Sequence, residues 1–157
     1  MPDVAFQALE QGMDSPSLRI LAGLSENENE FLIDSYFRNA LQELSIKLPD
    51  KRQAAIDVGL TIANEIFDGK RTIFQGVRDI RSEALDSYPF FEENIQYCYD
   101  SIGFEKIYGL YTTIEDLRDA GTTQWQSDKT NKELEEELTK DLFIELKIWT
   151  DRLLHGS

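Results

Sequence analysis

The sequence predicts an all-α fold, a single domain over residues 1–157 in which about six to seven helices form a bundle with a long C-terminal helix. Apolar residues recur three and four positions apart in five stretches, which is the spacing of one face of an α-helix. Four capping boxes, each a Ser, Thr or Asp followed three residues later by Glu or Gln, indicate helix starts. No stretch shows the apolar–polar alternation of a half-buried strand over a useful length.

Two helices are expected in the first third of the chain, after a short first segment over Val4–Glu10. Ser15 caps the first of these helices, which has proline at its first position, where a missing N–H costs nothing. Gly23 is expected to close this helix in the left-handed conformation. The other helix should begin at the capping box 25–28 and stop before Pro49, because the residue before a proline disfavours the helical conformation.

The middle of the chain predicts three more helices. Asp50 caps a stretch whose apolar residues spread broadly around the helix, so we expect it to be the central helix, ending at Asp68-Gly69. Thr72 starts the next helix, whose apolar stripe continues to Ala84. Tyr88-Pro89 interrupts the pattern. A further helix is then expected from a stripe of four residues: Phe91, Ile95, Cys98 and Ile102.

The last two helices follow Gly103 and Thr130. The first of them has a stripe of four residues on one face: Ile107, Tyr111, Ile114 and Leu117. Residues 121–127 are expected to form a loop. The final helix has a longer stripe: Leu134, Leu138, Leu142, Leu146, Trp149 and Leu153. At ~1.5 Å per residue it spans about 35 Å, and we expect it to pack along the central helix.

The charge of the chain argues against several classes of partner. The net charge is −14 and the isoelectric point is near 4.4. Binding to nucleic acid depends largely on Lys and Arg that replace counterions on phosphate, so this chain is poorly equipped for nucleic acid or an anionic membrane. No apolar run approaches the roughly 18 residues that cross a bilayer. The first residues lack the basic start of a signal peptide, and a cytoplasmic location is expected.

Residues for common catalytic and cofactor chemistry are scarce. The one histidine, His155, lies at the C-terminal end, where a catalytic group would lack rigid support. Cys98 lies on the apolar stripe between Ile95 and Ile102, so we expect a buried, unreactive thiol. The chain contains no glycine-rich nucleotide-binding loop. These observations predict no cofactor and no metal, and they favour a binding role over catalysis.

Carboxylates are the one chemically capable group in good supply, and they leave an alternative open. Glu83 and Asp86 have an ExxD spacing, and Asp116 and Asp119 have a similar spacing further along the chain. If these four side chains converge, they can bind Mg²⁺ and leave room for the phosphates of a nucleotide. A Mg²⁺-dependent nucleotide hydrolase is therefore one alternative function. A homo-oligomeric scaffold that uses exposed faces of the amphipathic helices is another.

The acidic residues concentrate in one part of the chain, which leads to the favoured hypothesis. Residues 83–120 hold nine acidic side chains and two basic ones, whereas residues 46–82 hold seven basic and five acidic ones. Tyrosines lie among these carboxylates, as in an interface with aromatic anchors for a basic protein. We expect a protein-binding module, an immunity- or antitoxin-like neutraliser of a basic partner. The residues expected to contact the partner are Glu92, Glu93, Tyr97, Tyr99, Glu115, Asp116 and Asp119.

Two segments of the sequence, Leu41–Pro49 with the following Ala54-Ala55-Ile56 and Ile66–Lys70, resemble a pattern in small uncharacterised bacterial helical proteins. In those proteins one helix ends in a segment like the first, and the next helix ends in a segment like the second. The match covers about a fifth of the chain. The resemblance implies a helical fold and a bacterial origin, and it implies no particular activity.

Overall fold

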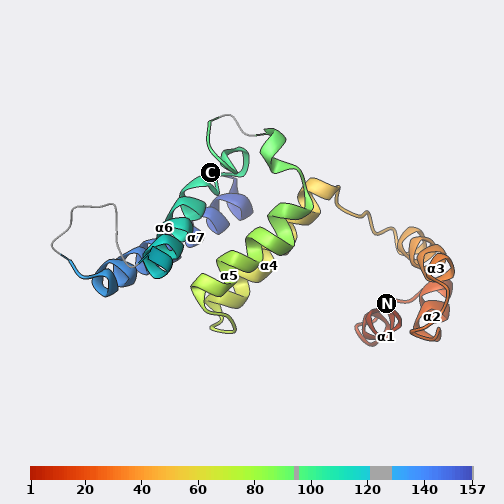
Figure 1. Cartoon of the computed structure of the whole chain (residues 1–157). Coiled ribbons are helices and arrows are strands. Elements are labelled where there is room, and N and C mark those ends of the chain that lie inside the picture. The colour runs from red at the N-terminus through yellow and green to blue at the C-terminus, as the bar shows by residue number, and fades with distance from the viewer. Residues whose placement is uncertain (94–95, 121–128, 157) are drawn as a thin grey trace. The chain divides into compact units, whose positions relative to one another are not determined.

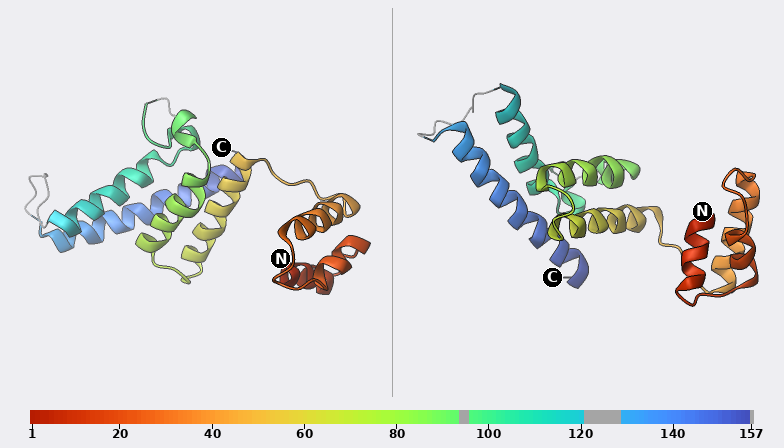
Figure 2. Two further views of the ribbon diagram at one scale, coloured as in Figure 1. Left: turned by 45° about the vertical axis from the view of Figure 1, so that its right-hand side comes forward. Right: turned by 90° about the horizontal axis from the view of Figure 1, so that it is seen from below.

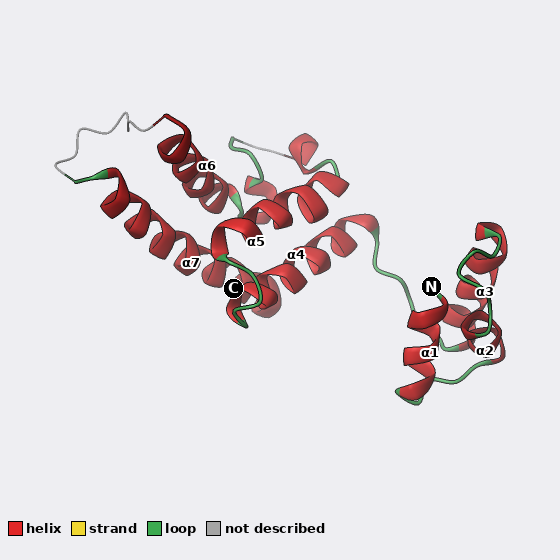
Figure 3. Ribbon diagram, turned by 60° about the horizontal axis from the view of Figure 1, so that its bottom comes forward, coloured by secondary structure: helices red, strands yellow, loops and turns green. Residues whose placement is uncertain are grey.

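A computed structural model of the chain describes residues 1–93, 96–120 and 129–156. These residues form seven α-helices, four short stretches of π-helix or 3-10 helix and no strand, as Figure 3 shows by colour. The predicted all-α fold with a long C-terminal helix is confirmed. The loop expected over residues 121–127 lies outside the described residues.

The chain divides into two compact units, Met1–Pro49 and Asp50–Ser157. Figure 1 colours the first unit from red to orange and the second from yellow to blue. The division falls between Pro49, before which the preceding helix was expected to stop, and Asp50, the cap of the next helix. The expectation of one folding domain over residues 1–157 stays a prediction.

The first unit is made of three helices, α1 (Pro2–Glu10), α2 (Pro16–Ala22) and α3 (Glu30–Glu43). Its buried core is small and consists of four residues: Ala5, Leu18, Leu21 and Ala40. Glu43 joins α3 to the first turn of α2. Its carboxylate accepts hydrogen bonds of 3.0 Å from the backbone N–H of Ser17 and 2.8 Å from the Ser17 hydroxyl. A negative charge at this place is favoured by the dipole of α2.

Four predicted helix starts are confirmed by their caps. The side chains of Ser15, Asp50 and Thr72 each accept a hydrogen bond from the backbone N–H three residues further on. Thr130 and Glu133 form a complete capping box at the start of the last helix. These side chains satisfy N–H groups that have no partner inside the helix.

Two details of the first unit differ from the prediction. The helix expected from the capping box 25–28 begins later, at Glu30, because the Ser25 hydroxyl accepts a hydrogen bond from Asn27 within a turn. Asn29 caps the helix instead, accepting a hydrogen bond of 2.9 Å from the N–H of Phe31. Gly23 has a φ of −90°, so α2 ends without the expected left-handed residue.

The second unit contains α4 (Lys51–Phe67), α5 (Ile73–Asp79), α6 (Glu105–Ala120) and α7 (Asn131–His155). Figure 2 shows α6 beside α7, and α4 beside α5. The last helix also packs against the central helix α4. A Cβ at Gly59 of α4 would lie 3.3 Å from the Trp149 ring, and the rings of Phe67 and Phe143 lie 5.5 Å apart.

Residues 80–104 differ most from the prediction. The helix begun at Thr72 changes at Ile80 into a π-helical turn that ends at Ala84. Three short 3-10 stretches follow: Leu85–Ser87, Phe90–Glu93 and Asp100–Ile102. The helix expected from the stripe that begins at Phe91 is therefore wrong for the residues that the structure describes there; Ile95 of that stripe lies outside them.

Two local features explain why residues 96–103 do not form an α-helix. The Asp100 carboxylate accepts hydrogen bonds of 2.7 Å from the N–H of Gln96 and 2.9 Å from the N–H of Tyr97. Such bonds compete with the hydrogen bonds of a helix. Tyr99 has a φ of +62°, in the left-handed region, which interrupts a right-handed helix. In consequence Cys98, which was expected to be buried, is exposed, and Tyr99 is buried instead.

Candidate partner-binding site

A row of aromatic side chains runs from the interior of the second unit to its surface. The ring centroid of Phe91 lies 4.8 Å from that of Tyr99, and Tyr99 lies 5.3 Å from Tyr108. Tyr99 is 1% exposed, whereas Phe91 is 54% exposed and Tyr97 is 60% exposed. The buried ring of Tyr99 therefore supports exposed aromatic neighbours, which limits the conformational freedom that Phe91 would lose on binding.

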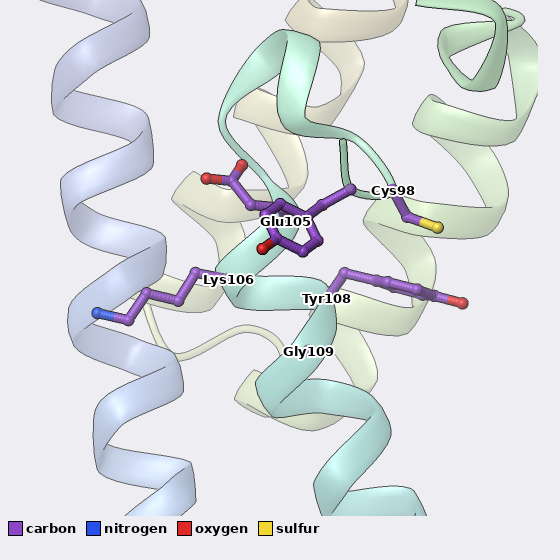
Figure 4. A pocket seen from close by; sticks show the side chains of 6 residues that line it. Cys98, Glu105, Lys106, Tyr108 and Gly109 are labelled. Atoms are coloured by element: carbon purple, nitrogen blue, oxygen red, sulfur yellow. The ribbon is translucent and has the colours of Figure 1, made fainter. Parts of the chain in front are cut away.

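A shallow pocket of about 390 Å³ lies where this row reaches α6. Six residues line it: Tyr97, Cys98, Glu105, Lys106, Tyr108 and Gly109. In Figure 4 Cys98 and Tyr108 project to one side of α6, and Lys106 projects toward α7, where its ammonium group forms an ion pair with Glu145. A Cβ at Gly109 would meet nothing within 4 Å, so the helix backbone is open to an approaching partner there.

Glu92 and Glu93 are neighbours in sequence but have different surroundings. The half-buried Glu93 carboxylate accepts hydrogen bonds of 2.8 Å from the Tyr88 hydroxyl and 3.1 Å from Nε of Arg52. The Tyr88 hydrogen bond, followed by the Arg52 contacts, lowers the pKa of Glu93. Glu93 thus ties its turn to α4, whereas Glu92 is exposed and open to a partner.

Tyr99 was expected to contact a partner, but its side chain lies in the core. Its hydroxyl donates a hydrogen bond of 3.0 Å to Asp86. Burial, followed by the hydrogen bond to Asp86, raises the pKa of Tyr99 strongly. Tyr99 therefore positions the aromatic row and does not present its own ring at the surface.

The three predicted carboxylates on α6 also differ in their surroundings. Glu115 is half-buried and accepts a hydrogen bond of 2.7 Å from the hydroxyl of Tyr111. Burial first, and then Glu115, raises the pKa of Tyr111 to about 12. Glu115 thus accepts a hydrogen bond from a buried tyrosine, whereas Asp116 and Asp119 are exposed.

Helix geometry places these two exposed carboxylates on the side of α6 that carries the pocket. Asp116 follows Gly109 by seven residues, about two turns, and Asp119 follows Tyr108 by eleven residues, about three turns. Residues at these spacings lie on one face of a helix. We define the acidic aromatic surface as six residues: Phe91, Glu92, Tyr97, Tyr108, Asp116 and Asp119.

Four of these six residues were among those expected from the sequence to contact a partner: Glu92, Tyr97, Asp116 and Asp119. Phe91 and Tyr108 were not among the residues expected to contact a partner, and Phe91 was expected in the core. The exposed Phe91 packs against Tyr99, whose left-handed conformation no helical periodicity indicates. Tyr108 lies next to the stripe residue Ile107, and its neighbour Gly109 is the available sign that this face of α6 is open.

The four carboxylates considered for a Mg²⁺ site have different surroundings. Glu83 and Asp86 contact different side chains, whereas Asp116 and Asp119 are exposed on α6. Asp86 accepts the Tyr99 hydrogen bond and lies 3.9 Å from Nε of Arg81, and Glu83 lies 4.0 Å from a guanidinium nitrogen of Arg71. Within residues 1–93, 96–120 and 129–156, no group of three or more His, Cys, Asp or Glu side chains is placed to hold a metal ion.

No helix among the described residues has both the length and the apolar character needed to span a bilayer. Comparison of the chain with protein-family models, with curated proteins and with solved structures finds no match.

Proposed function

We propose that this protein is a binding module for a basic protein, an immunity- or antitoxin-like neutraliser that covers its partner with the acidic aromatic surface. The observation that carries the proposal is a pocket lined by the exposed Tyr97 and by Tyr108, with the exposed Phe91 joined to it through the buried Tyr99. Large exposed aromatic side chains next to a pocket are typical anchors of protein interfaces.

The aromatic residues supply the affinity in this proposal. Phe91 and Tyr97 keep more than half of their surface in water, at 54% and 60% exposure, and a partner that covers them gains by burying apolar area. Phe91 rests on the buried Tyr99 at 4.8 Å, so binding orders few additional side chains. The pocket beside Tyr97 offers room for one side chain of the partner.

The carboxylates determine which partner is favoured. Glu92, Asp116 and Asp119 are exposed, and the chain carries a net charge of −14. Exposed charges of one sign raise the rate at which an oppositely charged protein associates, and they disfavour acidic competitors. A partner with Lys and Arg around an apolar protrusion therefore fits both features of the surface.

The test starts from a partner recovered by pull-down with the full chain, identified and then purified. A triple variant with Glu92→Lys, Asp116→Lys and Asp119→Lys should lower the association rate by about tenfold or more at low salt, with less effect at high salt. A matched control reverses three exposed carboxylates outside the surface, Glu10, Glu136 and Asp141, and changes the net charge equally.

Aromatic truncation tests the other half of the surface. Phe91→Ala and Tyr97→Ala should each weaken binding by about tenfold or more, mainly through faster dissociation. Phe31→Ala is the matched control, because Phe31 is 87% exposed and lies in the first unit. Binding that the controls weaken as much as the surface variants would overturn the proposal. A chain that self-associates through Phe91 in light scattering, and captures no basic protein, would support the scaffold instead.

A further inference from the structure

The first unit contains an apolar groove between its three helices. Its volume is about 200 Å³, and Val4, Met13 and Ile46 are among the residues that line it. Three alanines, Ala5, Ala8 and Ala40, also line it, and their small side chains leave space that larger residues would fill. The groove thus lies directly over the small core of the unit.

The rim of this groove keeps large apolar side chains in water. Val4 is 60% exposed, and Met13 and Ile46 are also exposed. Burial of such side chains is favourable by ~25 cal/mol per Å² of apolar area, so the groove gains from any apolar segment that fills it. A contiguous set of exposed apolar side chains of this kind marks an interaction surface.

An acidic cleft adjoins the apolar groove. It shares Phe37 and Met1 with the groove and adds three carboxylates: Glu26, Glu30 and Asp34. Residues 1–49 hold eight acidic side chains and three basic ones. Two of those basic residues, Arg19 and Arg38, form ion pairs with Asp14 and Asp34. Glu26 and Glu30 are then the carboxylates of the cleft that can attract a basic occupant. The mouth of the groove therefore favours a positively charged occupant.

We propose that this groove binds a basic amphipathic helix of a partner protein, with apolar side chains in the groove and Lys or Arg against the acidic cleft. An amphipathic helix that places its apolar face in a groove is a common mode of peptide recognition. The site uses residues of the first unit alone, so it is separate from the acidic aromatic surface and does not depend on the function proposed there.

The charges of the chain favour this occupant over the alternatives. A second copy would bring another net charge of −14 to a cleft already lined by carboxylates. Nucleic acid and anionic lipid would be repelled by the same carboxylates. A basic amphipathic helix meets the apolar lining and the charged mouth at once.

The probe is a fluorescent synthetic peptide that forms a helix with Leu along one face and Lys elsewhere, titrated against the full chain by fluorescence anisotropy. Val4→Glu places a charge on the rim and should weaken binding by about tenfold or more, the factor that 1.4 kcal/mol produces. Val58→Glu is the matched control, since Val58 is an exposed helical valine of the second unit. Circular dichroism verifies that both variants keep their helix content.

A second pair of variants tests the charged mouth. Glu26→Lys, which lies outside any helix, should weaken binding of the Leu/Lys peptide severalfold at low salt, and Glu10→Lys should not. A peptide with Glu in place of Lys should not bind. In an NMR titration the backbone amides of Leu18 and Ala40 should shift. Absence of binding, equal effects of the control variants, or shifts confined to the second unit would each overturn the proposal.

Two further variants separate this inference from the function proposed above. Tyr97→Ala should leave the affinity for the Leu/Lys peptide unchanged. Val4→Glu should leave unchanged the affinity for the basic partner that binds the acidic aromatic surface. Loss of peptide binding in Tyr97→Ala would place the peptide on the second unit and would overturn the groove proposal, while leaving the acidic aromatic surface intact.

Discussion

The indole Nε1 of Trp149 donates a hydrogen bond of 3.0 Å to the backbone carbonyl oxygen of Ile102. The donor belongs to α7 and the acceptor to the turn just before α6, residues that are 47 positions apart in sequence. Trp149 is 1% exposed, and its ring packs edge-on against Phe104 at 5.0 Å. The last helix thus holds in place the segment that carries Tyr97 and the pocket.

The first prediction concerns this hydrogen bond. Trp149→Phe keeps an aromatic ring but removes the donor and part of the volume, which leaves the Ile102 carbonyl buried without this partner. The free energy of unfolding should fall by about 2–4 kcal/mol. Urea unfolding followed by far-UV circular dichroism measures this loss. A loss below about 0.5 kcal/mol, typical of surface substitutions, would show that the contact contributes little.

The second prediction contrasts two glycines inside helices. A Cβ at Gly76 in α5 would overlap Cγ1 and Cδ1 of Ile66, whereas a Cβ at Gly109 in α6 would meet nothing within 4 Å. Gly76→Ala should therefore destabilise the protein by about 1–3 kcal/mol through overpacking. Gly109→Ala should stabilise it by about 0.5–1 kcal/mol, because alanine favours helix over glycine. Thermal unfolding of the two variants should shift in opposite directions.

Helix starts could be located from the sequence because a cap is a local interaction. Ser15, Asp50 and Thr72 each bind an N–H only three residues away, so the sequence contains both partners. The start of α3 was misplaced for the same reason. Residues 25–28 fit a capping box and equally fit a turn, and the structure uses the Ser25 hydroxyl in the turn.

The candidate site could be predicted only in part. Exposure of Glu92, Asp116 and Asp119 follows from their charge, since carboxylates without a partner stay in water. Tyr99 is buried and Cys98 is exposed, which is the reverse of the prediction, and this reversal depends on a positive φ at Tyr99. Few residues other than glycine adopt that conformation, and here the contacts of Tyr99 with distant residues stabilise it. Such contacts leave no periodic signal in a single sequence.

The third prediction concerns alkaline pH. Burial raises the pKa of Tyr111 to about 12, above the value of about 10 of an unfolded chain. The neutral hydroxyl therefore contributes stability that is fully present below about pH 10 and is lost as the pH rises toward about 12. In Tyr111→Phe, urea midpoints should fall less steeply over this range than in the unaltered protein. Tyr97→Phe, which removes the hydroxyl from an exposed tyrosine, is the control and should leave the profile as it is.

The fourth prediction concerns acid and the first unit. The backbone N–H of Ser17, with the hydroxyls of Ser15 and Ser17, lowers the pKa of Glu43. The Glu43 carboxylate therefore binds a proton more tightly in the unfolded chain than in the folded one. The stability due to ionised Glu43 is present above its ordinary pKa, and it is lost as the pH falls through the lower pKa of the folded state.

Glu43→Gln should therefore speed hydrogen exchange of the Leu18 and Leu21 amides at neutral pH and change it little in strong acid. Glu10→Gln is the control, since Glu10 is an exposed carboxylate at the end of α1. Amides of α6 report on the second unit and should exchange as before in both variants. Faster exchange in Glu43→Gln that is the same at every pH would mean that the loss comes from packing, and that the carboxylate charge does not stabilise α2.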